Sequence, residues 1–345
     1  MRKWFVVLLM FSGAAYGYSY LMTSGKIYFD QGEYQKAIEK FKQAAASSPN
    51  DPKPYIWLGR CYTELKDYVK ATDYFDSAMV KKPEIIKKMK KGQKYKRRRY
   101  DAMFFWRLYS NAGIILLQQN EFRRAINKLK TALKFNPDSA VTYNNIGYCF
   151  AKLAKEDTTL KDSIIYYYNK AIETNPKSVL SYVNLARFYL KEEDYKKASE
   201  YLSKAVELDS TNVDALYYLG ICYMKMKNYS DAELSFRKLL KLDSTNVDAR
   251  YNLAACLEKQ NKIKEAIAEL EKAHEIKKED IGVLDYLDYL YERIGDLKSR
   301  ERVLSEWIEI KPDDPRPYAR RAAVRKKLGD IEGYKADMAK YKELR

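Results

Sequence analysis

The sequence predicts an all-α solenoid built from about nine helical hairpins, and two observations carry this prediction. First, the octapeptide LDSTNVDA at 208–215 recurs unchanged at 242–249, a displacement of 34 residues. Second, 13 Gly and 9 Pro are few for 345 residues, whereas 32 Tyr are many. A period of this length accommodates two helices and their turns, and the composition favours long helices with aromatic packing over a turn-rich β fold.

Each repeat unit carries the pattern of two antiparallel helices. Counting from Tyr18, apolar residues recur at positions 4, 7, 11, 17, 24 and 27, which is helical spacing. Small residues at positions 8 and 20 allow the two helices to approach closely, and proline near the end of a unit terminates its second helix. Position 8 holds Gly25, Gly59, Gly113, Gly147, Ala186, Gly220 and Ala254. The nine units begin at Tyr18, Pro52, Trp106, Ala140, Val179, Val213, Val247, Ile281 and Pro315.

This pattern resembles the tetratricopeptide repeat, and the resemblance covers residues 18–345. It implies a right-handed superhelix whose concave side is lined by the first helix of each unit. One hairpin cannot bury its apolar faces alone, so neighbouring units are expected to stack into a continuous core. Two insertions interrupt the spacing, at 86–105 and near 155–161. The predicted organisation is a signal segment at 1–17, two units at 18–85, a basic insertion at 86–105 and seven units at 106–345.

The first residues are typical of an export signal. Arg2 and Lys3 give a positive start, an apolar run follows at 4–10, and small residues cluster at 13–17. We therefore predict cleavage after Gly17 and a periplasmic or envelope location of a bacterial protein. The alternative is an uncleaved inner-membrane anchor over residues 4–22, because about 20 apolar residues span a bilayer.

The four cysteines all fall at position 10 of their units, where every other unit has an apolar residue. They are Cys61, Cys149, Cys222 and Cys256. Equivalent positions in neighbouring repeats are about 10 Å apart, too far for a disulfide, which needs Cα atoms within about 7 Å. We therefore predict four reduced, buried thiols.

Catalytic and cofactor motifs are not found in the sequence. His274 is the single histidine, and there is no Cys/His metal spacing, phosphate-binding loop or nucleophile elbow. The sequence therefore predicts no enzyme activity, no cofactor and no metal site.

Position 6, on the predicted concave face, is rich in asparagine. In related superhelical repeat proteins, asparagines at this place hydrogen-bond the backbone of an extended peptide, because an amide both donates and accepts. The alternative is that asparagine occupies this position for structural reasons. The residues are Asn111, Asn145, Asn184 and Asn252.

Position 13 carries a cation in six consecutive units, which predicts a line of positive charge along the concave face. Such a line suits acidic or carboxylate-bearing partners, whereas the structural alternative is stabilisation of the dipole of the first helix. The residues are Lys152, Lys191, Lys225, Lys259, Arg293 and Lys327. The carboxylate clamp of chaperone-binding relatives needs Lys at position 5 and Asn at position 9 of one unit, and no unit has this pair.

The insertion concentrates the positive charge of the chain. Between Lys81 and Tyr100 there are eleven Lys or Arg and one acidic residue, a net charge of +10 out of +17 for the whole chain. An anionic membrane surface or an acidic protein would suit this patch, nucleic acid is disfavoured by the export signal, and a solvated extension of the flanking helices is the structural alternative. The patch comprises Lys87, Lys88, Lys90, Lys91, Lys94, Lys96, Arg97, Arg98 and Arg99.

The last two units depart from the pattern. Asp288 and Arg300 occupy positions 8 and 20 of the eighth unit, where small residues are usual, so we expect an ion pair between its helices. Tyr334 at position 20 of the ninth unit predicts that the C-terminal end is looser or reshaped.

Together these features predict a non-catalytic scaffold of the bacterial cell envelope. Its concave face would bind an extended peptide or a helix of a partner protein, and no small-molecule substrate is expected. Two alternatives are a structural protein that docks on a membrane surface through the insertion, and an escort subunit of an enzyme or secretion complex.

Overall fold

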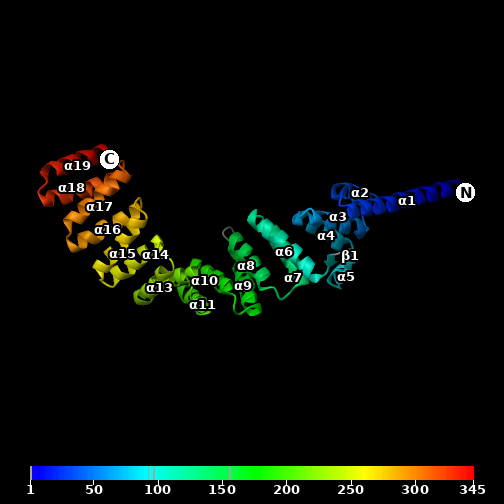
Figure 1. The fold of residues 1–345 in the computed structure, drawn as a ribbon, viewed down its shortest axis with the longest axis horizontal. Helices are drawn as coiled ribbons and strands as arrows, with labels where there is room; N and C mark the ends of the chain where they lie inside the picture. The colour runs from blue at the N-terminus through cyan, green and yellow to red at the C-terminus, as the bar shows by residue number, and fades with distance from the viewer. Residues whose placement is uncertain (1, 92, 96–97, 155–156) are drawn as a thin grey trace. The chain divides into compact units, whose positions relative to one another are not determined.

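The computed structural model describes residues 2–91, 93–95, 98–154 and 157–345, with side chains from residue 17 onward except at 92–99, 155–156 and 158. The chain divides into two compact units, Met1–Ser181 and Tyr182–Arg345, so the boundary falls inside one helix. Their described residues form nine helical hairpins, four in the first unit and five that belong wholly or mostly to the second (Figure 1). The predicted fold class, an all-α solenoid of about nine hairpins, is confirmed.

Unit 1 contains four hairpins and an inserted segment. The strands of the described residues lie in this insertion. There β1 and β2 pair antiparallel, with Gln93 opposite Tyr100. The elements are α1 (Arg2–Gln31), α2 (Tyr34–Ser47), α3 (Pro52–Glu64), α4 (Tyr68–Lys81), α5 (Ile85–Lys91), β1 (Gln93–Tyr95), β2 (Arg98–Tyr100), α6 (Ala102–Gln118), α7 (Phe122–Phe135), α8 (Ala140–Leu153), the short 3₁₀ helix η1 (Thr158–Leu160) and α9 (Lys161–Thr174).

Unit 2 repeats one hairpin five times without an insertion. Each first helix begins one residue after an Asn or Asp cap wherever a cap is described, and each second helix lies beside it (Figure 1). The elements are α10 (Val179–Lys191), α11 (Tyr195–Leu208), α12 (Val213–Lys225), α13 (Tyr229–Leu242), α14 (Val247–Lys259), α15 (Ile263–Ile276), α16 (Ile281–Ile294), α17 (Leu297–Ile310), α18 (Pro315–Leu328) and α19 (Ile331–Glu343).

The boundaries of the third hairpin differ from the expected unit. Its first helix begins at Ala102, four residues before Trp106, because the Asp101 side chain accepts a hydrogen bond from the amide of Phe104 at 2.9 Å. The first predicted unit starts at Tyr18, inside α1, which the structure describes as one helix from Arg2.

Among the residues that the structure describes, which omit 155–156 of the fourth hairpin, a left-handed residue separates the two helices in the other eight hairpins. This residue is always position 15 of the unit, and its φ lies between 58° and 85°. Glycine fills the position three times, whereas five units place a larger residue in a conformation that costs L-amino acids about 1 kcal/mol or more. The five are Lys66, Asn120, Glu193, Lys227 and Asn261. The sequence analysis did not identify this constraint, because the residue type varies while the conformation does not.

The small residue at position 8 makes room for a large side chain at position 24. A Cβ added to Gly220 would lie 2.6 Å from Cζ of Phe236, and one added to Gly59 would lie 2.8 Å from the Phe75 ring. Ordinary Cβ contacts are at least 3.4 Å. The close approach predicted at position 8 therefore occurs against the side chain from position 24, which is an aromatic ring beside Gly59 and Gly220 and Leu129 beside Gly113.

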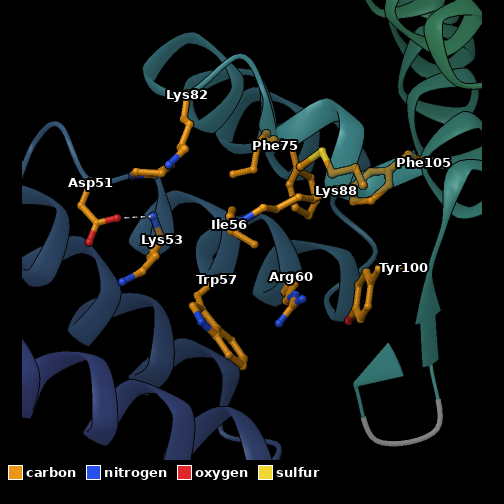
Figure 2. A pocket seen from close by; sticks show the side chains of 13 residues that line it. Asp51, Lys53, Ile56, Trp57, Arg60, Phe75, Lys82, Lys88, Tyr100 and Phe105 are labelled. Atoms are coloured by element: carbon orange, nitrogen blue, oxygen red, sulfur yellow. Dashed lines mark hydrogen bonds between the residues drawn. The ribbon is translucent and has the colours of Figure 1, made fainter. Parts of the chain in front are cut away.

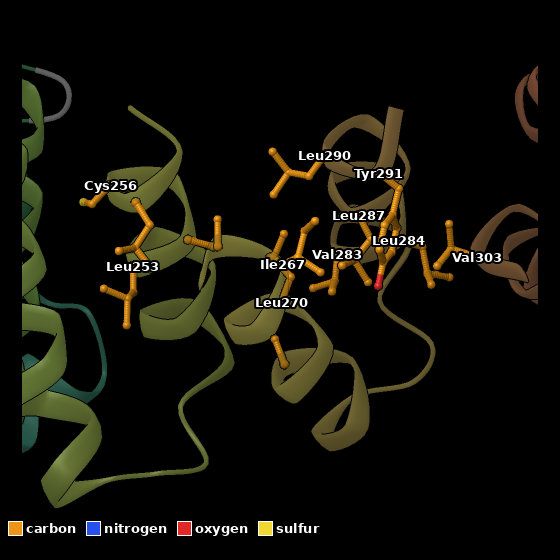
Figure 3. Close-up of a cluster of buried hydrophobic side chains, with 14 of the residues drawn as sticks. Leu253, Cys256, Ile267, Leu270, Val283, Leu284, Leu287, Leu290, Tyr291 and Val303 are labelled. Atoms are coloured by element: carbon orange, nitrogen blue, oxygen red, sulfur yellow. The ribbon is translucent and has the colours of Figure 1, made fainter. Parts of the chain in front are cut away.

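The core of unit 2 is continuous over several hairpins. Leu253 from α14, Leu270 from α15 and Leu287 from α16 belong to one buried cluster that extends to Trp307 of α17 (Figure 3). All four cysteines are free and fully buried, as predicted. Their place in the apolar interior agrees with position 10 being a packing position.

The C-terminal hairpins replace part of this apolar core by buried ion pairs. Arg300 Nε donates to Asp288 Oδ1 at 2.8 Å with both side chains buried, which is the predicted pair between positions 20 and 8. In the last hairpin, Asp337 is the buried residue of α19 and accepts hydrogen bonds from Arg321 and Arg325 of α18. The final hairpin is therefore reshaped around a carboxylate.

Candidate functional site

The first helices of unit 2 present a row of tyrosine and arginine side chains. We call the following residues the first-helix surface: Asn184 and Arg187 of α10, Tyr218 of α12, Tyr251 and Asn252 of α14, and Tyr286 and Tyr289 of α16. All are exposed or half-buried. Helical spacing places them on successive first helices, while the apolar positions of the same helices point into the core.

Contacts between consecutive first helices hold this surface together. The Arg187 guanidinium lies 5.3 Å from the centre of the Tyr218 ring. The rings of Tyr251 and Tyr286 are 5.2 Å apart, and Asn252 donates a hydrogen bond to the Tyr217 hydroxyl at 3.3 Å. Each contact joins one hairpin to the next, so the side chains are positioned before any partner arrives.

A largely buried carboxylate, Glu258, organises the C-terminal half of the surface. It accepts hydrogen bonds from Tyr286 at 3.2 Å and Tyr289 at 3.4 Å, and it pairs with Arg293 at 2.8 Å and Lys259 at 3.5 Å. Its side chain is only 10% exposed. Burial and the Glu258 charge raise the pKa of the Tyr286 hydroxyl well above its usual value, so this tyrosine stays a neutral donor.

The four asparagines predicted to form a ladder lie on first helices, two in each unit. In unit 2, Asn184 and Asn252 lie on α10 and α14, and the equivalent positions of α12 and α16 are Tyr218 and Tyr286. In unit 1, Asn111 is exposed on α6 and Asn145 is half-buried on α8. The position-6 row is thus a mixture of amides and phenols.

Only some of the cations predicted at position 13 are both exposed and without an ion pair or ring contact among the described residues. Lys191, Lys225 and Lys327 are exposed near the ends of their helices. Lys259 and Arg293 both contact Glu258, which neutralises part of the positive charge there, and Lys152 in unit 1 lies 5.0 Å from the Tyr148 ring. Glu258 was not predicted as a site residue, because nothing in the sequence distinguishes one largely buried carboxylate among 47 acidic residues.

The insertion forms an amphipathic helix followed by a strand pair. In α5, Ile85 and Met89 are buried, and the four lysines of the helix are exposed. These are Lys87, Lys88, Lys90 and Lys91. The remaining predicted patch residues, Lys94, Lys96, Arg97, Arg98 and Arg99, lie outside the described side chains. A solvated extension of the flanking helices does not account for the buried face of α5.

Beneath α5 lies a pocket of about 550 Å³ in unit 1. Its apolar wall includes Ile56 and Trp57 of α3, Phe75 of α4 and Phe105 of α6 (Figure 2). The Arg60 guanidinium is 7% exposed and lies 4.7 Å from the Trp57 ring and 4.6 Å from the Tyr100 ring. The insertion therefore closes over the first helix of the second hairpin through an aromatic–guanidinium stack.

The remaining cysteine and histidine side chains are buried or largely buried. Burial raises the pKa of Cys61 and of the other three thiols to about 12, which keeps them protonated and unreactive. The side chain of His274 is mostly buried, with Nε2 2.6 Å from Glu306. Within the described part of the chain, no group of three or more His, Cys, Asp and Glu side chains is placed to hold a metal ion.

The predicted export segment falls largely on residues whose side chains lie outside the described set, since these begin at residue 17. Among the helices that the structure describes, none is both long enough and apolar enough to cross a membrane.

Sequence comparisons match repeat profiles along the chain. A profile described as TPR repeat matches residues 25–66 and 113–153, and one described as Tetratricopeptide repeat matches 229–285. A profile for subunit 3 of the anaphase-promoting complex (cyclosome) matches residues 157–239.

Two curated relatives illustrate the range of similarity. The chain is 24% identical over 204 residues to Hsp70-Hsp90 organizing protein 3 of Arabidopsis thaliana, which covers 53% of this chain and 35% of the relative. It is 31% identical over 90 residues to the peroxisomal targeting signal receptor of Candida glabrata, covering 26% of this chain and 14% of the relative. The chain thus spans about a third of the length of the first of these relatives.

The fold matches that of solved proteins at low identity. The structure of pilF from Pseudomonas aeruginosa aligns with a TM-score of 0.51 and 18% identity, covering 66% of this chain and 99% of that one. At this level of identity the match concerns the arrangement of helices alone.

Proposed function

Because the chain belongs to the tetratricopeptide repeat family, whose members generally mediate protein–protein interactions, we propose that it is a non-catalytic scaffold. Unit 2 binds an extended peptide or a helix of a partner protein on the first-helix surface. The names of two relatives, an organizing protein for Hsp70 and Hsp90 and a targeting signal receptor, describe proteins that act on other proteins.

The observation that carries this proposal is the row of four tyrosine rings and the Arg187 guanidinium that successive first helices hold in place. Tyr and Arg dominate the energetics of protein interfaces, because a rigid ring or fork buries much area at a small entropic cost. The contacts between Tyr251 and Tyr286 and between Arg187 and Tyr218 fix these groups in advance, which reduces that cost further.

The test is affinity capture with matched tyrosine substitutions. Tyr251→Ser removes a ring that is 39% exposed on the first-helix surface, and Tyr166→Ser removes a ring that is 53% exposed on α9, a second helix. Captured proteins are compared quantitatively at low salt. We expect at least one protein to be lost with Tyr251→Ser and kept with Tyr166→Ser. Identical sets from both variants and the parent chain would rule out this surface.

We also propose that the protein is exported and works in the bacterial cell envelope. The support is the positive start at Arg2 and Lys3, the apolar run and the small residues before Tyr18. A fusion of residues 1–22 to a reporter enzyme that is active only outside the cytoplasm tests this. Activity is expected, and the mass of the chain purified from cells separates cleavage after Gly17 from retention as an anchor.

A second candidate role is docking on an anionic membrane surface through the insertion. The specific observation is α5, which packs Ile85 and Met89 inward and leaves its four lysines exposed. Each lysine near an anionic surface contributes about 1 kcal/mol before salt screening. Sedimentation with phosphatidylglycerol vesicles should then fall steeply with salt and with neutralisation of these lysines. Equal sedimentation with neutral vesicles would exclude this role.

A further inference from the structure

We infer that the pocket between α3 and α5 of unit 1 binds an amphiphilic anion, a molecule with one apolar chain or ring system and one anionic head. This site is separate from the first-helix surface of unit 2, and it requires a ligand chemistry that the proposed scaffold role does not. The inference rests on the shape of the pocket, on its apolar wall and on the charges at its mouth.

The size and the wall of the pocket fit a small apolar body. Its volume of about 550 Å³ is within the range of 300–1,000 Å³ typical of small-molecule sites. Five elements close around it, α3, α4, α5, β2 and α6, so the space is a pocket rather than an open strip along one helix. Ile56, Trp57, Phe75, Met89 and Phe105 supply the apolar contacts.

The mouth of the pocket is strongly cationic. Three exposed lysines line it, Lys53 of α3, Lys82 after α4 and Lys88 of α5, and the buried Arg60 adds a fourth cation to the pocket wall, against one carboxylate among the described lining residues, Asp51. That carboxylate is already engaged, since Asp51 accepts from the Lys53 amide at 2.9 Å and from the Tyr18 hydroxyl. Figure 2 shows the Lys88 side chain extending across the pocket toward Ile56.

The arrangement of these cations favours an enclosed head group over a flat membrane. The lysines come from three separate segments of the chain and line one pocket, whereas a bilayer surface needs charges spread over a common plane. The lining also favours an acyl-like anion over a peptide. Among the described side chains that line it, which do not include those of residues 92–99, the Tyr100 hydroxyl is the one hydroxyl or amide available to a buried peptide backbone, which would be costly to leave unsatisfied.

Two neighbouring lysines of α5 provide a matched pair for the test. Lys88 lines the pocket and Lys87 does not, although both are exposed on the same helix and carry the same charge. A lysine-to-glutamate change removes an attraction and adds a repulsion at close range, so Lys88→Glu should weaken binding of an anion in the pocket about tenfold. Lys87→Glu should change the dissociation constant by less than about threefold, through screened long-range charge alone.

The experiment is calorimetric titration of the full chain with four twelve-carbon probes below their micelle concentrations. Laurate and dodecyl phosphate carry the two anionic heads, whereas dodecanol and dodecyltrimethylammonium have a neutral and a cationic head. We expect saturable binding of one or both anions, weaker binding of the alcohol and none of the cation. The preferred anion shows whether the head is a carboxylate, as in a free fatty acid, or a phosphate, as in a lipid head group.

Two further variants and one vesicle arm decide the remaining outcomes. Ile56→Trp should abolish binding by filling the pocket without changing its charge, and circular dichroism checks that the chain still folds. Equal weakening by Lys87→Glu and Lys88→Glu would overturn the inference, because it would place the ligand on the general basic patch. Binding to phosphatidylglycerol vesicles or to an acidic peptide, without binding of either monomeric anion, would also overturn it.

Discussion

Substituting Gly220 by alanine tests the packing rule that joins the two helices of each hairpin. The new Cβ would lie 2.6, 2.8 and 2.9 Å from three atoms of the Phe236 ring, so the ring or the helix must move by about 0.8 Å to restore an ordinary contact. Overpacking of this kind costs about 1–3 kcal/mol, whereas alanine in place of glycine stabilises a helix by about 1 kcal/mol. The net result should be a loss of about 1–2 kcal/mol.

The sequence itself contains the compensating change. Where position 8 is Ala186 or Ala254, position 24 is Leu202 or Leu270, not a ring. In a Phe236→Leu background, Gly220→Ala should therefore become neutral or stabilising, which corresponds to a coupling of about 2 kcal/mol in the double-mutant cycle. Because repeat proteins open locally, hydrogen exchange of the α12 and α13 amides is the suitable assay. Equal costs of Gly220→Ala in both backgrounds would refute the rule.

Three other predictions follow from the same geometry. Lys227→Gly should stabilise the α12–α13 hairpin by about 0.5–1 kcal/mol in the same exchange assay, because glycine adopts a φ near 60° without the steric strain that lysine has there. A loss of protection from exchange would contradict this strain at position 15. Asp288→Ala should lower the free energy of unfolding in urea by about 3–5 kcal/mol, because it leaves Arg300 buried without this partner. The double variant Asp288→Gly with Arg300→Ala should recover most of that stability, and no recovery would show that the pair itself is needed. The four thiols should resist N-ethylmaleimide at pH 8 in the native chain. The free energy of unfolding should fall above about pH 9, because thiols of the unfolded chain ionise near 8.5 while those of the folded chain keep a pKa of about 12. A free energy of unfolding that stays constant from about pH 8 to 10.5 would contradict their burial.

The repeat architecture was predictable because the same residue types recur at fixed spacing. The burial of the cysteines followed from the apolar occupants of position 10 in other units. The Asp288–Arg300 pair followed from two simultaneous departures at positions that face each other. In each case the residue types at one repeat position could be compared across the units of a single chain, as they would otherwise be compared across related sequences.

The features that sequence analysis missed have no repeated residue type behind them. At position 15, Gly and Asn, which favour the left-handed conformation, occupy five of the eight units, but Lys and Glu occupy the other three, so the residue type alone does not mark the position. Glu258 becomes the centre of the first-helix surface because of its neighbours on α16, 28 and 31 residues away at Tyr286 and Tyr289. The pocket of unit 1 is formed by five elements that only tertiary packing brings together, which is why a small-molecule ligand was not expected.

The central claim, that partner recognition takes place on the first helices of unit 2, is tested most directly by photo-crosslinking in living cells. A photoreactive amino acid is placed at Asn184 or Lys225 on first helices, and at Glu200, an exposed residue of the second helix α11, as a control. The account predicts one defined partner captured from Asn184 and Lys225 and not from Glu200. Capture of the same proteins with equal yield from Glu200, or no capture from either first-helix site, would contradict it.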